Sequence, residues 1–267
     1  MVASCKNVTN VLIAINIYSM CGTMNCIASI VDSTLIGVMV MIAIRPILFN
    51  TEMVLAILDG RKDATRRIVK GFIPDDAVWG YTAFTPKGYI SCRGTFADGY
   101  GEKFFKLPCD PGDILYVRES VFQGVGRYLD VSGETVCVLT NDFEYYADGL
   151  HEKDHWKDKY ENTWMHRRPS IHMPKEAARI WLKVTDVRVE RLQEITEDGC
   201  HREGINIETS AVTDGETLNR NHDFSLEKFE VLWDSTVKKS DLDRYGWNAN
   251  PWVWVIEFER CEKPETL

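Results

Sequence analysis

The stretch Arg45–Lys70, RPILFNTEMVLAILDGRKDATRRIVK, sets the interpretation of the whole chain. Its first half predicts a short strand over 42–49 and then a short helix. Asn50 or Thr51 is the expected N-cap, because both side chains accept hydrogen bonds from helical N–H groups. Gly60 is the expected end of the helix, with Met53, Ile57 and Leu58 on its buried face.

A strongly cationic segment follows the helix. Five cations lie within ten residues of a chain whose net charge is −9: Arg61, Lys62, Arg66, Arg67 and Lys70. Such a cluster in an acidic chain indicates a site for an anionic or nucleotide-like ligand. The alternative is a solvated cap at the helix C-terminus, where cations are favourable.

The composition is that of a soluble globular protein, with 45% apolar and 27% charged residues among 267. The acidic balance argues against broad, non-specific binding to nucleic acid. The eight cysteines show no C-x-x-C spacing, so we expect reduced thiols in a cytoplasmic protein rather than disulfides or a zinc site. We therefore expect no metal and no cofactor.

The first forty residues differ from the rest, because Asp32 is the only charge between Lys6 and Arg45. Three interpretations stay open: an upstream extension outside the fold with translation starting at Met39 or Met41, a membrane-associated or signal-like segment, or a structured element. We expect residues 1–41 to lie outside the fold. We expect no stable membrane association unless this extension is a real part of the protein.

The remainder, 42–267, predicts an α+β domain, a mostly β barrel with a few short helices and long loop insertions near 72–107 and 120–175. After the first helix, we expect strands over 114–118, 135–146, 179–184, 187–192 and 251–259. We expect a charged surface excursion over 147–168 and an extended connector over 169–174. Two further helices are expected: a short one that starts at Thr196 and carries Glu203, and one capped by Ser225 that buries Leu226, Phe229 and Trp233.

Several of these segments resemble the ASCH domain, a relative of the PUA RNA-binding barrel. They are Gly60-Arg-Lys-x-x-Thr65-x-Arg67, Pro111-Gly-Asp-x-Leu115-x-Val117, Val184-Thr-Asp-Val187, Leu192-Gln-Glu-Ile-Thr196 with Glu203-Gly-Ile205, and Trp254-Val-Ile-Glu-Phe258. The stretches 45–53, 168–174 and 247–252 look like the larger ASCH proteins of tailed phages and prophages. The resemblance covers roughly residues 42 to 260.

The resemblance implies RNA or modified-nucleoside binding in a cleft beside the barrel. A small bacterial branch of the family hydrolyses N(4)-acetylcytidine with a Lys, a Thr and a Glu, which correspond to Lys62, Thr65 and Glu203. This chain is much longer than that branch, so binding without catalysis stays open. A third alternative is a phage assembly or host-interaction protein that uses the barrel as a scaffold.

The residues themselves suggest roles for such a reaction. Thr65 supplies a hydroxyl, Lys62 acts as a base if burial and neighbouring cations lower its pKa, and Glu203 accepts or relays the proton. Lys62 and Thr65 are three residues apart and meet only if the chain turns between them. Arg61, Arg66, Arg67 and Lys70 are the expected ligand-binding cations.

Two histidine features complete the candidates. His172, held between two prolines, is expected to line the cleft. His151-Glu-Lys-Asp-His155 matches the H-E-x-x-H zinc motif, but its charged neighbours leave no apolar helix face, and we interpret it as a surface segment.

Overall fold

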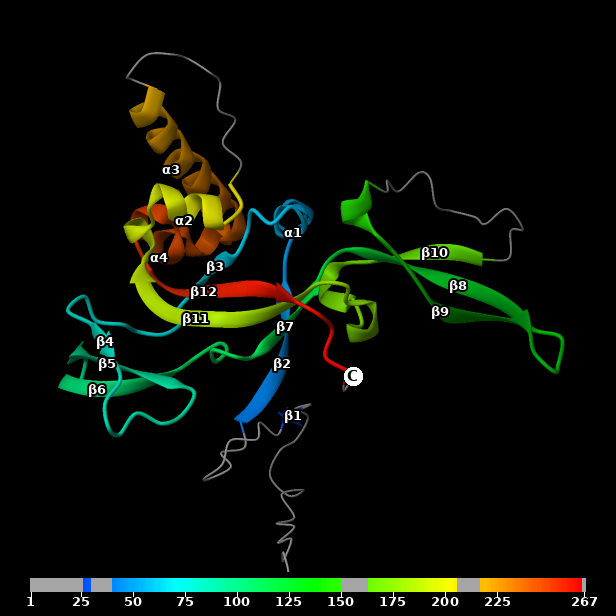
Figure 1. The fold of residues 1–267 in the computed structure, drawn as a ribbon, viewed down its shortest axis with the longest axis horizontal. Coiled ribbons are helices and arrows are strands. Elements are labelled where there is room, and N and C mark those ends of the chain that lie inside the picture. Colours follow the sequence, from blue (N-terminus) through cyan, green and yellow to red (C-terminus); the bar gives the residue numbers. More distant parts are fainter. Residues whose placement is uncertain (1–25, 30–39, 150–162, 206–216, 266–267) are drawn as a thin grey trace, which may run out of the picture. The chain divides into compact units, whose positions relative to one another are not determined.

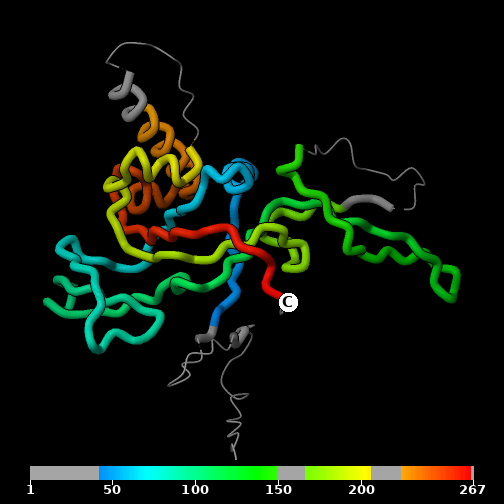
Figure 2. Tube along the Cα trace, in the orientation of Figure 1, coloured from blue at the N-terminus to red at the C-terminus, as the bar shows by residue number. Residues whose placement is uncertain are grey.

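The computed structural model describes residues 26–29, 40–149, 163–205 and 217–265 (Figures 1 and 2). The chain divides into two units, residues 1–43 and 44–267. In the first unit, β1 (Cys26–Ser29) pairs antiparallel with residues 40–43 at the start of β2 (Val40–Leu48). All the sites described below lie in the second unit.

The second unit is built on a sheet with the strand order β2-β7-β11-β12-β3. β2 and β7 run parallel, and the other neighbours run antiparallel. The bounds of the four further strands are β7 (Ile114–Arg118), β11 (Trp181–Arg191), β12 (Trp252–Cys261) and β3 (Ala64–Ile68). The two strands expected over 179–192 are one continuous strand, β11, whose register shifts between Val184 and Asp186.

This sheet curls until its two edge strands approach each other. Arg67 of β3 donates a hydrogen bond from Nη2 to the carbonyl oxygen of Leu48 in β2, at 2.9 Å. In a flat sheet these edges would be about 19 Å apart, too far for one side chain to bridge. Within the described residues no strand pairing joins β2 to β3, so the expected barrel is not closed. We call the gap between Leu48 and Arg67 the seam.

Two smaller sheets occupy the ranges where we expected loop insertions. One consists of β4 (Val78–Gly80), β5 (Tyr89–Phe96) and β6 (Gly99–Lys106). The other consists of β8 (Val121–Leu129), β9 (Thr135–Tyr145) and β10 (Thr163–Arg168), and we call it the arm. The expected surface excursion over 147–168 is therefore wrong at its C-terminal end, which pairs with β8. The H-E-x-x-H segment lies outside the described residues.

In the described parts of the chain, four α-helices accompany the sheets: α1 (Thr51–Leu58), α2 (Glu197–Arg202), α3 (Thr217–Thr236) and α4 (Leu242–Tyr245). Asn50 caps α1 by accepting from the Met53 N–H at 2.8 Å, and Thr196 caps α2 as predicted. The buried face of α1 is centred on Val54, Ala56 and Ile57, with Met53 and Leu58 only partly buried.

The prediction for α3 was wrong at its start. Ser225 is buried inside the helix, eight residues beyond its first residue, Thr217. The expected face was right, because Leu226, Phe229 and Trp233 pack into a hydrophobic cluster. Among the described helices, none is long and apolar enough to span a membrane.

Short 3-10 turns complete the fold. One of them replaces the extended connector expected over 169–174. They are η1 (Tyr146–Asp148), η2 (Ser170–His172), η3 (Lys175–Ala177), η4 (Leu192–Glu194), η5 (Lys239–Asp241) and η6 (Trp247–Ala249).

The side chains of β12 point alternately to the two faces of the sheet, and each face packs into its own hydrophobic core. Trp254, Ile256 and Phe258 pack with Phe49 and Ile57 on the inner face of the curled sheet. Val253 and Val255 pack on the outer face with the apolar side of α3. The fold is thus α+β, mostly sheet, with α2 and α3 covering the outer face (Figure 1).

Candidate functional site

Lys62 and Glu203 meet although they are 141 positions apart. Gly60, at φ +75°, ends α1, and the N–H groups of Arg61 and Lys62 both donate to the Ala56 carbonyl. Lys62 then forms an isolated bridge with Glu203, the C-cap residue that directly follows α2. The Lys62 Nζ donates to Glu203 Oε2 at 2.7 Å, the Glu203 carbonyl at 2.9 Å and the Ala64 carbonyl at 2.7 Å.

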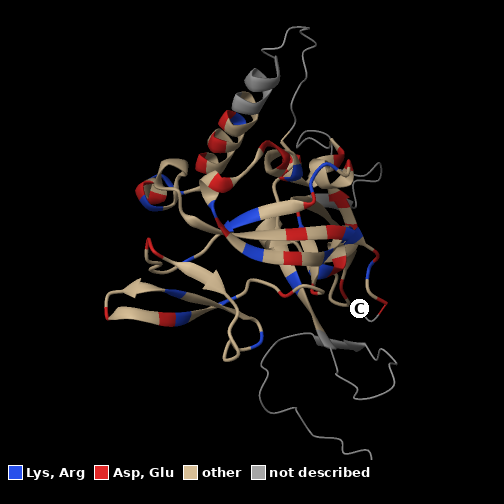
Figure 3. Cartoon of the chain, turned by 60° about the vertical axis from the view of Figure 1, so that its left-hand side comes forward, with Lys and Arg blue, Asp and Glu red and all other residues tan. Residues whose placement is uncertain are grey.

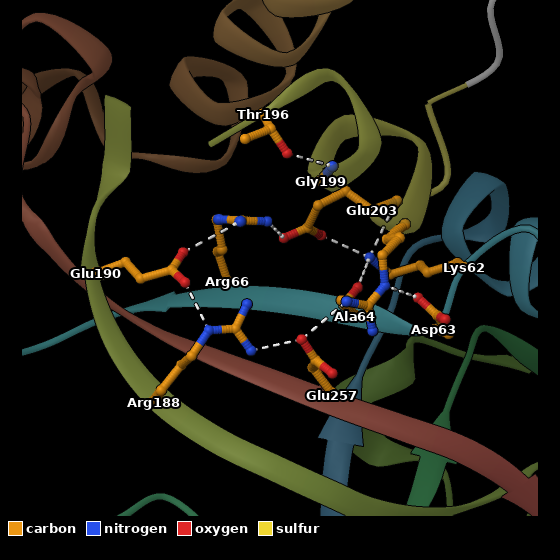
Figure 4. A network of polar contacts seen from close by, with 11 residues as sticks. Lys62, Asp63, Ala64, Arg66, Arg188, Glu190, Thr196, Gly199, Glu203 and Glu257 are labelled. Carbon is orange, nitrogen blue, oxygen red and sulfur yellow. Dashed lines mark hydrogen bonds and ion pairs between the residues drawn. The ribbon is translucent and has the colours of Figure 1, made fainter. Parts of the chain in front are cut away.

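Glu203 also belongs to a chain of ion pairs that spreads over the outer face of the sheet (Figure 4). Its Oε1 accepts from Arg66 Nη1 at 3.3 Å, and Arg66 Nη2 reaches Glu190 Oε2 at 3.4 Å. We call the whole set the ion network; it consists of Lys62, Asp63, Arg66, Asp186, Arg188, Glu190, Arg202, Glu203 and Glu257. Figure 3 shows the same mixture of charges on the central strands.

Burial and neighbouring charges shift the acidity of this network. Burial lowers the pKa of Lys62, whose side chain is 0% exposed; the Glu203 carboxylate opposes the shift, and Arg67 and Arg66 reinforce it. This is the direction that we predicted for a Lys62 base. Hydrogen bonds from Arg202 and Arg188 lower the pKa of Glu257 to about 2, against the opposing effect of burial.

Thr65 lies beside Glu203 on a small cavity of about 30 Å³. The cavity is lined by Met53, Thr65, Arg66, Arg67, Glu203, Phe229, Leu232, Trp233 and Thr236. Within the described residues, the buried Nε of Arg66 has no hydrogen-bond partner. A buried donor and a carboxylate around such a volume suit a single water molecule or one polar atom of a ligand.

Two larger cavities flank this centre. The first, which we call the α1–α3 groove, has a volume of about 400 Å³ and is lined by Asn50, Glu52, Met53, Leu55, Arg61, Glu203, Gly204, Ile205, Lys228 and Leu232. It shares Met53, Glu203 and Leu232 with the water-sized cavity, so the two are adjacent.

The second, which we call the seam cavity, has a volume of about 370 Å³. Its walls are Arg45, Pro46, Ile47, Leu48, Arg67, Pro108, Cys109, Leu115 and Ile256. Arg67 is also part of the wall of the water-sized cavity, so both cavities border this residue.

The structure divides the predicted ligand-binding cations into different environments. Arg66 is only 6% exposed and faces two carboxylates, so a phosphate would have to displace Glu203 or Glu190. Arg61 is exposed, pairs with Asp59 and borders the α1–α3 groove. Lys70 is exposed and borders none of the three cavities described here.

His172 and Trp79 lie apart from this centre. His172 is exposed in η2, within hydrogen-bonding distance of Arg168 through its carbonyl, and lines none of these three cavities. Trp79 packs edge-on against Phe105 and Trp252 in the inner core. The ring of Trp79 is therefore a packing element rather than a surface for stacking bases.

Sequence reasoning missed the carboxylates and arginines that complete the network. Arg188, Glu190 and Glu257 lie on the outward-facing positions of β11 and β12, and Arg202 lies at the end of α2. The available signal was the alternation of charged and apolar residues in Val187–Arg191, which is also typical of a strand that faces solvent.

Among the described residues, no group of three or more His, Cys, Asp or Glu side chains is arranged to hold a metal ion. The five described thiols Cys92, Cys109, Cys137, Cys200 and Cys261 are unpaired. No family model, no curated protein and no solved structure matches this chain.

Proposed function

We propose that this chain is a PUA-like, ASCH-type protein that binds a modified nucleoside and hydrolyses the acetamide of an N(4)-acetylcytidine-like group. The observation that carries the proposal is the convergence of three residues from distant segments. Lys62 and Glu203 form a buried pair, and Thr65 and Glu203 share one water-sized cavity. Buried, mutually perturbed ionisable groups beside a cavity are a frequent property of catalytic sites.

The α1–α3 groove is the space for the nucleoside. Its volume of about 400 Å³ is within the range of small-molecule sites, whereas the cavity at Thr65 holds only one or two atoms. Because Met53, Glu203 and Leu232 border both spaces, a nucleoside in the groove can direct its acetyl oxygen or carbonyl carbon toward Thr65. Arg61 and Lys228 at the groove wall supply the positive charge.

The reaction requires two steps. In the first, the Thr65 oxygen bonds to the acetyl carbon while the hydroxyl proton passes to Glu203. The C–N bond then breaks, and the cytosine amino nitrogen takes the proton. In the second, water cleaves the threonine ester and releases acetate.

Lys62 orients the base in this proposal. It holds Glu203 Oε2 at 2.7 Å, and its lowered pKa lets it share the proton within the pair. This assigns the contact with the Thr65 hydroxyl to Glu203 rather than to Lys62, because it is Glu203 that lines the cavity with Thr65.

Deacetylation of N(4)-acetylcytidine tests the proposal directly. We expect the wild-type chain to release cytidine and acetate, separated by liquid chromatography. Thr65→Val removes the nucleophile at constant volume and should lower kcat/KM at least about a hundredfold, whereas Thr65→Ser should retain activity.

The matched control is Thr236→Val, which alters a hydroxyl of the same cavity that already donates to the Trp233 carbonyl. This control should change kcat/KM less than about threefold. Absence of product with the wild-type chain, or equal rates for wild type and Thr65→Val, would refute the hydrolase proposal.

A second candidate function is a non-catalytic assembly or host-interaction protein. The observation that favours it is the arm, on which Tyr128, Leu129, Val136, Val138 and Leu139 are all exposed. Apolar side chains gathered on a surface are typical of contact sites. If neither cytidine nor RNA binds, and Val136→Ser with Val138→Ser abolishes association with a co-expressed phage structural protein, this function replaces the first.

A further inference from the structure

Arg67 differs from the other buried or partly buried cations around the site. Lys62 and Arg66 pair with Glu203, and Arg45 pairs with Asp113 at 3.0 Å. Within the described residues, Arg67 has no carboxylate partner. A cation that is withdrawn from water without a counter-charge is costly, so proteins normally pair such groups.

The contacts that Arg67 does make are weaker substitutes for a carboxylate. Its Nη2 donates to the Leu48 carbonyl at 2.9 Å, and its guanidinium carbon lies 5.3 Å from the centre of the Phe49 ring. The Nζ of Lys62 lies 5.5 Å from the same ring. Burial lowers the pKa of Arg67, with Glu203 opposing the shift, which is the expected result for a desolvated cation.

The space next to Arg67 is large enough for a ligand. The seam cavity of about 370 Å³ falls within the volume range of small-molecule sites. Ile47, Leu115 and Ile256 give it an apolar wall, and Arg45 adds a second guanidinium. An apolar wall beside an arginine that has no ion pair within the described residues suits a ligand that joins a flat apolar body to an anion.

We propose that the seam cavity binds a nucleoside monophosphate, with its phosphate on the Arg67 guanidinium and its base against the apolar wall. An arginine fork matches a phosphate with two parallel N–H···O bonds, which would give Arg67 the directly bonded anion that it lacks within the described residues. The anion site stands on the environment of Arg67 alone. The nucleotide body of the ligand rests on the proposed function.

Two kinds of ligand carry such a phosphomonoester: a free nucleotide and the phosphorylated end of an RNA. Both present the same chemistry to Arg67. Titrating cytidine monophosphate, a 5′-phosphorylated trinucleotide and the same trinucleotide with a 5′-hydroxyl distinguishes them. Tighter binding of the phosphorylated trinucleotide than of the mononucleotide assigns the RNA end, and the reverse assigns the free nucleotide.

The test uses methyl NMR of the full chain, which needs no variant to locate the ligand. Cytidine monophosphate should shift the methyl signals of Ile47, Leu115 and Ile256 around the seam cavity. The methyl groups of Leu55, Ile205 and Leu232 report on the α1–α3 groove. Shifts confined to the groove, or no shifts at all, would overturn the seam proposal, and neither result depends on whether acetylcytidine is hydrolysed.

Variants then test the role of the charge. Arg67→Gln should weaken binding of cytidine monophosphate at least about tenfold, and unphosphorylated cytidine should bind the wild-type seam cavity at least about tenfold more weakly than its monophosphate. Arg67→Lys should retain part of the affinity. Lys70→Gln removes an exposed cation two residues beyond β3 and should change affinity less than twofold. Equal binding by wild type and Arg67→Gln would refute the proposal.

Discussion

Arg66 and Arg67 are neighbours in β3, but they point to opposite faces of the same sheet. Arg66 lies opposite Val255, on the outer face beneath α3, where Glu203 and Glu190 neutralise it. Arg67 lies opposite Trp254, on the inner face, where a carbonyl oxygen and an aromatic ring take the place of a carboxylate. Within the described residues, Arg66 thus forms ion pairs with two carboxylates on the outer face, whereas Arg67 forms none on the inner face.

The largest effect should come from removing the carboxylate that the outer face shares. Glu203→Gln leaves Lys62 buried without its counter-ion and Arg66 with Glu190 alone, so we expect a loss of about 3–5 kcal/mol in the free energy of unfolding. Urea denaturation measures it.

The exposed pair Lys183–Glu259, at 3.5 Å, is the control for this variant. Glu259→Gln should cost less than about 0.5 kcal/mol. The double variant Lys62→Met with Glu203→Gln should recover part of the loss, because the orphaned ammonium is gone. If both single variants had the same small effect, the outer network would not be architectural.

Gly204→Ala tests how closely α2 must approach the cationic segment. A Cβ at this position would lie 2.7 Å from the Ala56 Cβ and 3.2 Å from the Lys62 Cβ, at a backbone φ of +89°. We expect a loss of about 2–3 kcal/mol from strain and overlap.

Gly60→Ala measures the cost of the positive backbone φ alone, without the steric overlap expected at Gly204. The φ of Gly60 is +75°, and nothing lies within 4 Å of the added Cβ. Only about 1 kcal/mol should be lost there. Thermal unfolding of both variants provides the comparison, and equal losses would show that the contact with Lys62 is not tight.

The two arginines themselves give the most direct comparison. Arg66→Gln breaks contacts to two carboxylates and should lower the free energy of unfolding by about 2 kcal/mol. Arg67→Gln removes a desolvated charge that forms no ion pair within the described residues, so the change should stay within about 0.5 kcal/mol. A larger loss for Arg67 than for Arg66, in urea without ligand, would reverse our assignment of the two faces.

The last comparison concerns acid. Arg202 and Arg188 lower the folded-state pKa of Glu257 to about 2 from its usual 4.5. The resulting stabilisation is fully present above pH 4.5 and is lost as the pH falls toward 2. Glu257→Gln should therefore flatten the decline in unfolding free energy across this window. An unchanged slope would mean that other carboxylates dominate the acid response.

Much of the fold could be predicted because it is encoded locally. Asn50 and Thr196 are N-caps whose side chains accept a hydrogen bond from a backbone N–H three residues later. The strand predicted over 114–118 has the same bounds in the structure. The start of α3 was missed because Ser225 looks like a cap but is buried in the helix, and 206–216 lies outside the described residues. The curl of the sheet was not predicted, because it brings together Arg67 and Leu48, which belong to different strands, and no local sequence pattern indicates that contact.

The candidate site residues came from resemblance rather than from local patterns. The motif at Lys62 and Thr65 and the distant Glu203 were identified from resemblance, and their convergence is a geometric fact of the structure. The charges that neutralise Arg66 could not be assigned, because an alternating strand such as Val187–Arg191 has the same pattern whether water or a helix covers it. The contrast between Arg66 and Arg67 is thus invisible in a sequence where they stand side by side.

The seam gives the sheet a mechanical property. Within the described residues, every strand junction from β2 through β12 to β3 is a ladder of several backbone hydrogen bonds, whereas the seam is bridged by the Arg67–Leu48 hydrogen bond and by the packing of Arg67 on the Phe49 ring. Widening the seam would break these side-chain contacts and leave every ladder intact. The two edges at the seam are therefore held together by side chains, whereas the other junctions of this sheet are held by the backbone.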